Sequence, residues 1–293
     1  MGALQFLLVL LDVYAHIVVG IMHHGQCRLY AMSFHLNNNL QIVTAMKKAR
    51  IGICDVEIYE SIEELPITRW HKYQKYSLIE SGIGSDLASV DAHIARAIAY
   101  FKKGEGDKAS AELQNLRQAV YFVQNEENLR LLSCACLIKS VDGVPCDDLT
   151  EEGLRRVVEK ITDVPTNVVA ALFKAVKKKM DTEVATYFPS LYSATSKEKE
   201  FSDILLKRTI AEIHTITRGE DDAKVRELDE TLLTMITPMT FQGEKNFEVE
   251  YDKQFEKMCA IISQHQGVNA KQYNVMEFFA AYEQIKEQHN GRR

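Results

Sequence analysis

The chain has 293 residues, of which 46% are hydrophobic and 26% charged, and its formal net charge is -6. A chain of this length buries a sizeable core in one large or two modest domains. The acidic balance argues against a protein built mainly to grip nucleic acid, because neutralising phosphates requires clustered Lys and Arg. The charge is uneven: residues 1–50 carry four basic residues and one acid, a balance of +3, so the rest of the chain carries -9.

Residues 1–50 form an apolar and basic N-terminal extension. Ala3–Leu11 and Ile17–Met22 are apolar but lack the positive flank of a secretory signal. The combined stretch is long enough to cross a membrane, yet Asp12 and His16 lie near its centre, where charge is costly. Three interpretations stay open: a packed helix, a membrane anchor, or a non-native or disordered extension of a reading frame that starts at Met32 or Met46.

The pattern downstream predicts a short strand and then a series of helices. Arg50–Tyr59 is β-rich, and Phe241–Tyr251 suggests a hairpin or an extended connector. Ser85 and Asn274 are expected to cap helices, and Gly267 to separate the last two. Apolar residues at spacings of three and four predict helices over 66–80, 86–101, 108–123, 126–139, 154–161, 165–188, 197–218, 221–236, 252–265 and 274–288.

These elements predict a mainly α-helical fold, a multi-helix globular bundle with at most one or two short strands or a small hairpin. Residues 51–238 form the main helical domain, and residues 239–293 form a C-terminal connector with a two-helix segment. The helix over 86–101 has a particularly regular apolar set, which we expect to be one buried stripe. Its members are Leu87, Val90, Ile94, Ala97, Ile98 and Phe101.

Six cysteines are too few for a disulfide scaffold in a chain of this length. Cys134 and Cys136 lie two apart in a predicted helix and so point to different faces. With Cys146 they still lack the fourth ligand of a structural zinc site. The sequence therefore predicts free buried thiols, no metal, no cofactor and a reducing, cytoplasmic environment.

The densest aromatic cluster is Trp70, His71, Tyr73 and Tyr76, close to three basic residues. Such a cluster is able to stack on bases, but a single helix does not supply a groove. The favoured interpretation buries Trp70, Tyr73 and Leu78 and leaves Arg69, Lys72 and Lys75 in solvent.

No catalytic residues are assigned from the sequence. Ser81–Asp86 has two glycines, but it lacks the third glycine of a dinucleotide loop and the lysine of a P-loop. Lys177–Lys179 is interpreted as a solvated helix face. No histidine has the partner spacing of a zinc protease helix.

The last helix is the best candidate for a surface that contacts a partner. It is rich in large apolar groups, and such a helix either packs on its own core or enters a groove on another protein. The partner-binding candidates are Met276, Phe279 and Tyr282 on this helix, together with Trp70.

Three segments resemble a group of helical proteins of tailed phages and prophages of Bacteroides-type gut bacteria, over residues 55–290. They are IYESIEELPITRWHKYQKYSLIESGIGSD (58–86), YDKQFEKMCAIISQH (251–265) and YNVMEFFAAYEQIKE (273–287). The resemblance implies a protein made in the host cytoplasm that enters the virion or assists its assembly, in the style of tail-assembly chaperones. It carries over no active-site residues.

We therefore expect a non-enzymatic phage structural or assembly protein whose partners are other proteins. Two alternatives stay open: a nucleic-acid-associated regulatory protein that uses the basic stretches 69–75 and 174–179, and an enzyme whose site is assembled from distant residues. No small-molecule substrate is evident, and a membrane partner is expected only if the N-terminal segment is native.

Overall fold

The computed structural model describes residues 48–125, 129–161, 166–192, 196–219, 221–241, 243 and 246–290. The N-terminal extension lies outside this part of the chain, apart from its last three residues, and its three interpretations lie outside it too.

Helices make up most of the described chain, which confirms the expected mainly α-helical, multi-helix fold. Two short 3-10 helices, η1 (Pro189–Tyr192) and η2 (Ala270–Gln272), precede α8 and α11. The α-helices are α2 (Ile67–Gly82), α3 (Leu87–Lys102), α4 (Gly106–Gln124), α5 (Leu129–Cys136), α6 (Glu151–Ile161), α7 (Thr166–Tyr187), α8 (Ser196–Arg218), α9 (Ala223–Met235), α10 (Phe247–Gln266) and α11 (Val275–Asn290).

The sheet has more strands than the sequence indicated. It is antiparallel, in the order β1 (Lys48–Ile51), β2 (Cys54–Ile58), β3 (Ile138–Val141) and β4 (Val144–Pro145). The strand expected over 50–59 is thus a hairpin that turns at Gly52, whose φ is 62°. A second hairpin turns at Asp142 and Gly143, both with positive φ, as tight two-residue turns require.

The helix expected over 126–139 ends earlier than predicted. α5 stops at Cys136, and Ile138–Val141 pairs with β2 instead. The apolar run Leu137–Ile138 is fully buried, so it satisfies the periodicity of a buried helix and of a buried strand equally well. The long-range pairing with β2 decides between them.

Of the two possibilities for 241–251, a hairpin or an extended connector, the hairpin is wrong, because α10 begins at Phe247. The Asn246 side chain caps this helix by accepting hydrogen bonds from the backbone N–H groups of Glu248 (2.8 Å) and Val249 (3.3 Å). Phe247, Tyr251 and Phe255 then recur every four residues on one helix face, and Tyr251 and Phe255 are buried.

Most helix boundaries agree with the local signals in the sequence. Asn274 and Glu277 form a reciprocal capping box at the start of α11, with N–H to side-chain oxygen distances of 2.8 and 3.0 Å. Gly267 ends α10 in the left-handed conformation, with φ of 69°. One expected cap is wrong: Asp86, and not Ser85, caps α3 by accepting from the Ser89 backbone N–H at 2.8 Å.

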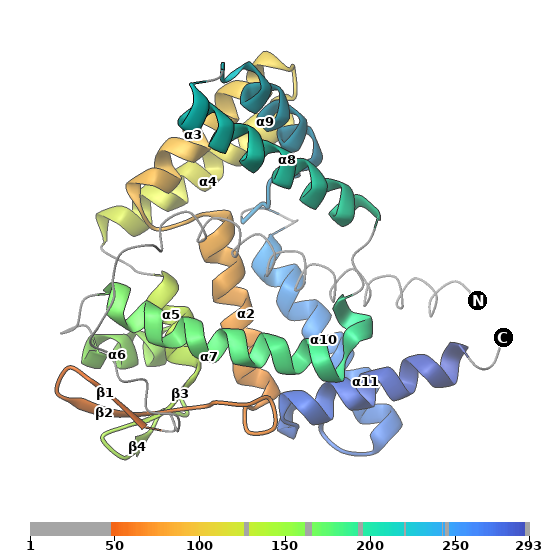
Figure 1. Cartoon of the computed structure of the whole chain (residues 1–293). Helices are drawn as coiled ribbons and strands as arrows, with labels where there is room; N and C mark the ends of the chain where they lie inside the picture. The colour runs from red at the N-terminus through yellow and green to blue at the C-terminus, as the bar shows by residue number, and fades with distance from the viewer. Residues whose placement is uncertain are drawn as a thin grey trace.

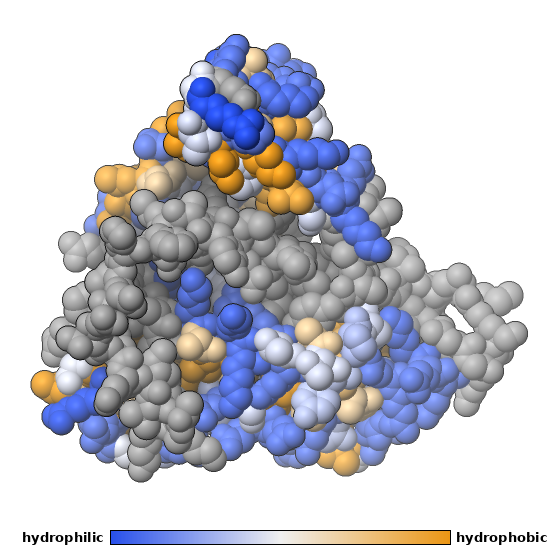
Figure 2. Space-filling model, in the orientation of Figure 1, coloured by the Kyte–Doolittle hydropathy of each residue, from blue (hydrophilic) through white to orange (hydrophobic). Residues whose placement is uncertain are grey.

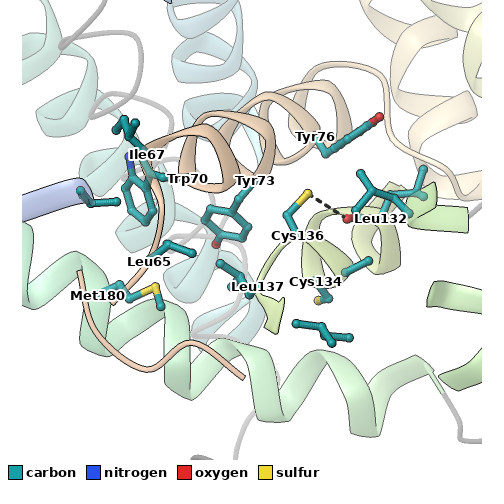
Figure 3. Close-up of a cluster of buried hydrophobic side chains, with 14 of the residues drawn as sticks. Leu65, Ile67, Trp70, Tyr73, Tyr76, Leu132, Cys134, Cys136, Leu137 and Met180 are labelled. Carbon is teal, nitrogen blue, oxygen red and sulfur yellow. Dashed lines mark hydrogen bonds between the residues drawn. The ribbon is translucent and has the colours of Figure 1, made fainter. Parts of the chain in front are cut away.

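The helix α2 runs through the middle of the main core (Figure 1). It packs against α5 on one side and against α10 and α11 on another, and the sheet lies next to α6, where the Cys54 thiol donates to the Lys160 carbonyl oxygen (3.4 Å). Figure 3 shows Trp70 and Tyr73 of α2 directed toward Leu137 and toward Met180 of α7. This core is continuous from the sheet to α11, so it includes residues of both the expected main domain and the expected C-terminal segment.

Backbone hydrogen bonds tie the start of α2 to the start of α11. The Val275 N–H donates to the Leu65 carbonyl oxygen (3.0 Å), and the Ile67 N–H donates to that of Tyr273 (2.9 Å). The helices α3, α4, α8 and α9 form an upper lobe with a small core of its own around Tyr100 (Figure 1). In the described part of the chain, no helix is both long and apolar enough to cross a membrane.

Candidate protein-binding surface

The solvent-facing side of α3 carries a stripe of large apolar side chains. Leu87, Ile94, Ile98 and Phe101 stand at i, i+7, i+11 and i+14, so they share one helix face. They are between 41% and 70% exposed. The prediction that this stripe is buried is therefore wrong for these four residues, whereas Ala97 is buried and Val90 is half-buried and packs against the main core.

The reason is that α3 packs through a neighbouring, more polar face. His93, Ala97 and Tyr100 are buried on that face. The Tyr100 hydroxyl donates to the carbonyl oxygens of Leu233 and Ile236 on α9 and its C-cap, both at 3.2 Å. His93 and Tyr100 are buried on this face because their polar groups form hydrogen bonds within the protein. A prediction based on hydrophobicity alone therefore chose the wrong face of α3 as the buried one.

A buried ion cluster joins α3 to α4. Nδ1 of His93 lies 2.6 Å from Glu112 Oε2, and Arg96 Nε donates to Glu112 Oε1 at 3.0 Å. Nε2 of His93 lies 2.8 Å from the Ile83 carbonyl oxygen. Burial raises the pKa of Glu112, but the hydrogen bonds from His93 and Arg96 outweigh it, so the pKa lies below its ordinary value.

Acid–base catalysis uses these residue types, but here their geometry is that of a buried structural contact between two helices. Both ring nitrogens of His93 already face protein oxygens, and the side chains of His93 and Glu112 are only 1% and 3% exposed. A general base needs a free position within reach of a substrate proton. The cluster therefore fixes α3 on α4 and sets the direction in which the apolar stripe faces.

The second exposed apolar surface is on α8. None of its described side chains, from Lys199 to Arg218, is buried, although the helix has 23 residues. One face lies on α9, where Arg208 Nε donates to Asp229 Oδ1 at 2.9 Å. The other face carries aliphatic side chains that are 46% to 76% exposed, namely Leu206, Ile210, Ile213 and Ile216.

Hydrophobic residues gather on the visible face of the upper lobe, over the region of α3, α4 and α8 (Figure 2). Single exposed apolar side chains are normal on soluble proteins. Two aligned stripes on one lobe are not, because contiguous apolar patches mark interaction sites. The α3 stripe, Leu87, Ile94, Ile98 and Phe101, and the α8 stripe, Leu206, Ile210 and Ile213 with Ile216 at its edge, are therefore the candidate functional surface.

A second polar cluster lies between α2 and α10. The His71 ring stacks on Tyr251 and Phe255, with centroid distances of 4.7 and 4.0 Å. Its Nε2 lies 2.8 Å from Asp252 Oδ1, and Lys75 Nζ lies 2.8 Å from the other carboxylate oxygen. The arrangement fastens two core helices to each other.

Electrostatics in this cluster favour a neutral imidazole beside an ionised carboxylate. Burial lowers the pKa of His71, against the opposing influence of Asp252. Burial raises the pKa of Asp252, but hydrogen bonds from His71 and Lys75 outweigh it and hold that pKa well below its usual range. His71 thus donates to Asp252 at neutral pH.

The basic stretch 69–75 is largely inside the protein. Arg69 Nη1 donates to the carbonyl oxygens of Ile138 (2.9 Å) and Cys136 (3.3 Å), and Nη2 donates to that of Cys146. The expectation that Arg69 and Lys75 are solvated is therefore wrong, since both are buried. Charges engaged in this way do not reach a phosphate backbone. In the other stretch, Lys178 and Lys179 are exposed, as a solvated face requires.

The described cysteines are free and, apart from the half-buried Cys146, buried, in agreement with the sequence. Burial raises the pKa of Cys134 and of Cys136 to about 12, so both are protonated thiols at neutral pH and poor nucleophiles. Within the described ranges, no group of three or more His, Cys, Asp or Glu side chains is arranged to hold a metal ion.

The four partner-binding candidates from the sequence do not form one surface. Trp70 and Tyr282 are 4% and 6% exposed, so their side chains belong to the core. Met276 and Phe279 are half-buried and pack against that core, with the Phe279 ring 5.7 Å from the Phe188 ring. Most of the apolar face of α11 is thus occupied by its own protein, which is the first of the two interpretations of this helix.

The chain matches no protein-family model, and comparison with curated proteins and with solved structures gives no match either. The candidate surface therefore rests on the geometry of α3 and α8. Sequence reasoning missed it because regular apolar spacing was taken to mean burial. The sequence of α8 did contain a signal, because its apolar residues lie on two opposite faces of the helix. A single packing partner covers only one of these faces.

Proposed function

We propose that this protein acts without catalysis, as a structural or assembly factor that binds another protein through the α3 stripe. The observation that carries the proposal is the alignment of four exposed apolar side chains along one face of a helix whose other face is firmly packed. The resemblance to tailed-phage proteins suggests virion assembly, with a second phage protein as the partner.

The shape of the stripe favours a partner that is itself an amphipathic α-helix. From Leu87 to Phe101 the stripe extends about 21 Å along α3, at 1.5 Å per residue. A long, narrow apolar ridge of this kind fits the apolar face of another helix. The partner helix would contact it through apolar residues at i, i+4 and i+7. The stripe is acidic near its N-terminal end, at Asp86 and Asp91, and basic near its C-terminal end, at Lys102.

Those charges predict the orientation of the partner helix. Basic side chains of the partner should lie opposite Asp91, and acidic side chains opposite Lys102, because complementary charges at the rim of an apolar interface fix its register. The buried clusters described above are satisfied within the protein, so they supply no open acid–base site that would favour an enzyme.

A photo-crosslinking residue placed at Ile98 in cells that carry the native gene tests this proposal. Ala95 provides the matched control, because it is exposed on the same helix but about 90° away from the stripe. We expect a crosslink to one defined protein from position 98 and none from position 95. The purified partner should then bind the chain, and Ile98→Asp should weaken binding by about 1–3 kcal/mol, as loss of an apolar anchor does.

The same substitution should leave folding almost unchanged. Ile98 is half exposed, so Ile98→Asp is expected to alter the free energy of unfolding by less than about 0.5 kcal/mol. Equal crosslinking from positions 95 and 98, or a purified partner that binds Ile98→Asp as tightly as the native chain, would refute the proposal.

A further inference from the structure

We propose that α8 pairs with α8 of a second copy of this chain, as an antiparallel helix dimer centred on Ile210. This surface is separate from the α3 stripe, so the inference goes beyond the proposed partner binding and does not depend on it.

The first support is that α8 has an apolar face that the described part of its own chain leaves uncovered. At 100° per residue, Leu206, Ile210 and Ile213 lie within about 60° of one another. Arg208, which contacts Asp229 on α9, lies on the opposite side of the helix. The stripe therefore faces away from α9, and its members remain 46% to 60% exposed.

The second support is that this face is self-complementary when the two helices run in opposite directions. A twofold axis through Ile210 places it against Ile210 of the second copy and places Leu206 against Ile213 of the second copy. The same register brings Leu205, which is half-buried, beside Ile216 of the second copy. One patch thus covers itself, as an isologous interface requires.

Charges at the edge of the stripe select the antiparallel direction. Asp203 and Arg218 are both exposed and lie on the same flank of α8. In the antiparallel register Asp203 stands next to Arg218 of the second copy, which is an attractive pair. In a parallel, in-register pair, Asp203 and Arg218 of the second copy would be about 22 Å apart along the helices, so this attraction would be lost.

Sedimentation of the full chain over a range of concentrations tests the dimer directly. We expect a reversible monomer–dimer equilibrium whose dissociation constant rises at least tenfold in Ile210→Asp. Ile53→Asp is the matched control: it makes the same change at an exposed isoleucine in the turn between β1 and β2, outside both apolar stripes, and the dissociation constant should stay within twofold of the native value. A chain that stays monomeric up to its solubility limit would overturn the inference, as would a dimer that Ile210→Asp leaves intact.

A charge exchange tests the direction of pairing. Asp203→Arg alone should weaken the dimer, because it stands next to Arg218 of the second copy. Adding Arg218→Asp should restore the native dissociation constant to within about twofold, since the pair is then reversed across the interface. If the double variant is weaker than the single variant, the antiparallel register is wrong. Circular dichroism of each variant checks that the helices are retained.

Discussion

Replacing Phe279 by alanine measures whether the last helix belongs to the core or to a binding surface. Its ring is half-buried, 5.7 Å from the ring of Phe188 and 5.8 Å from that of Phe278. Truncating a fully buried Phe costs about 3–5 kcal/mol, and an aromatic pair contributes about 0.5–1.5 kcal/mol. The Phe279 ring is only partly buried, so its truncation removes about half of that burial together with the two ring contacts. For Phe279→Ala we therefore expect the free energy of unfolding to fall by about 2 kcal/mol.

Urea unfolding followed by circular dichroism gives this number, provided that the slope against denaturant is unchanged. Phe278→Ala is the matched control, because the adjacent ring is only 1% exposed and should show the full cost of about 3–5 kcal/mol. A loss below about 0.5 kcal/mol for Phe279→Ala would mean that the ring is free on the surface. In that case the assignment of this side chain to packing fails, and α11 returns as a docking surface.

Three further substitutions test the buried polar contacts. Arg69→Met should lower the free energy of unfolding by about 3 kcal/mol or more in urea unfolding, because each buried carbonyl that loses its donor costs about 1–3 kcal/mol, and Arg69→Lys should recover only part of it. Asp252→Asn should cost about 1.5–3 kcal/mol near pH 7. Because the folded pKa of Asp252 is lowered, the advantage of the native chain over this variant should persist above pH 3.8 and shrink as the pH falls toward the folded pKa, and an advantage that instead grows in acid would contradict the cluster geometry. Asp181 behaves in the opposite way: burial raises its pKa to about 7, so the folded state holds a proton that the unfolded state releases, and stability should fall as the pH rises from 3.8 to about 7. Asp181→Asn should therefore be more stable than the native chain by about 1–3 kcal/mol at pH 8 and similar to it near pH 4, as thermal melts at both pH values will show.

The helical fold was predictable because its signals are local. Asn274 with Glu277, and Gly267 at the end of α10, fix helix ends by contacts within a few residues. The sheet was only partly predictable, since β3 acquires its strand identity from pairing with β2, more than 80 residues earlier in the chain. The local sequence pattern of β3 does not indicate that it pairs with a strand so distant in the chain.

The candidate surface was not predictable for a different reason. The spacing from Leu87 to Phe101 shows that these residues share a face, but it does not show whether another element of the chain covers that face. Burial of α3 is decided instead by His93 and Tyr100, whose polar groups find partners on α4 and α9. Trp70 is buried, as the sequence favoured, but the basic residue beside it does not stay in solvent, because Arg69 turns inward to three backbone carbonyls.

The hydrogen bonds between the start of α2 and the start of α11 bear on how the protein is made. The backbone of Val275 and Tyr273 bonds to that of Leu65 and Ile67. The helix α2 is among the first described elements to be synthesised, and its partner α11 is among the last. Until α11 arrives, a growing chain exposes the side of α2 that this helix covers, and such uncovered apolar surface is prone to aggregation. The main core is thus expected to close only after translation has passed α11.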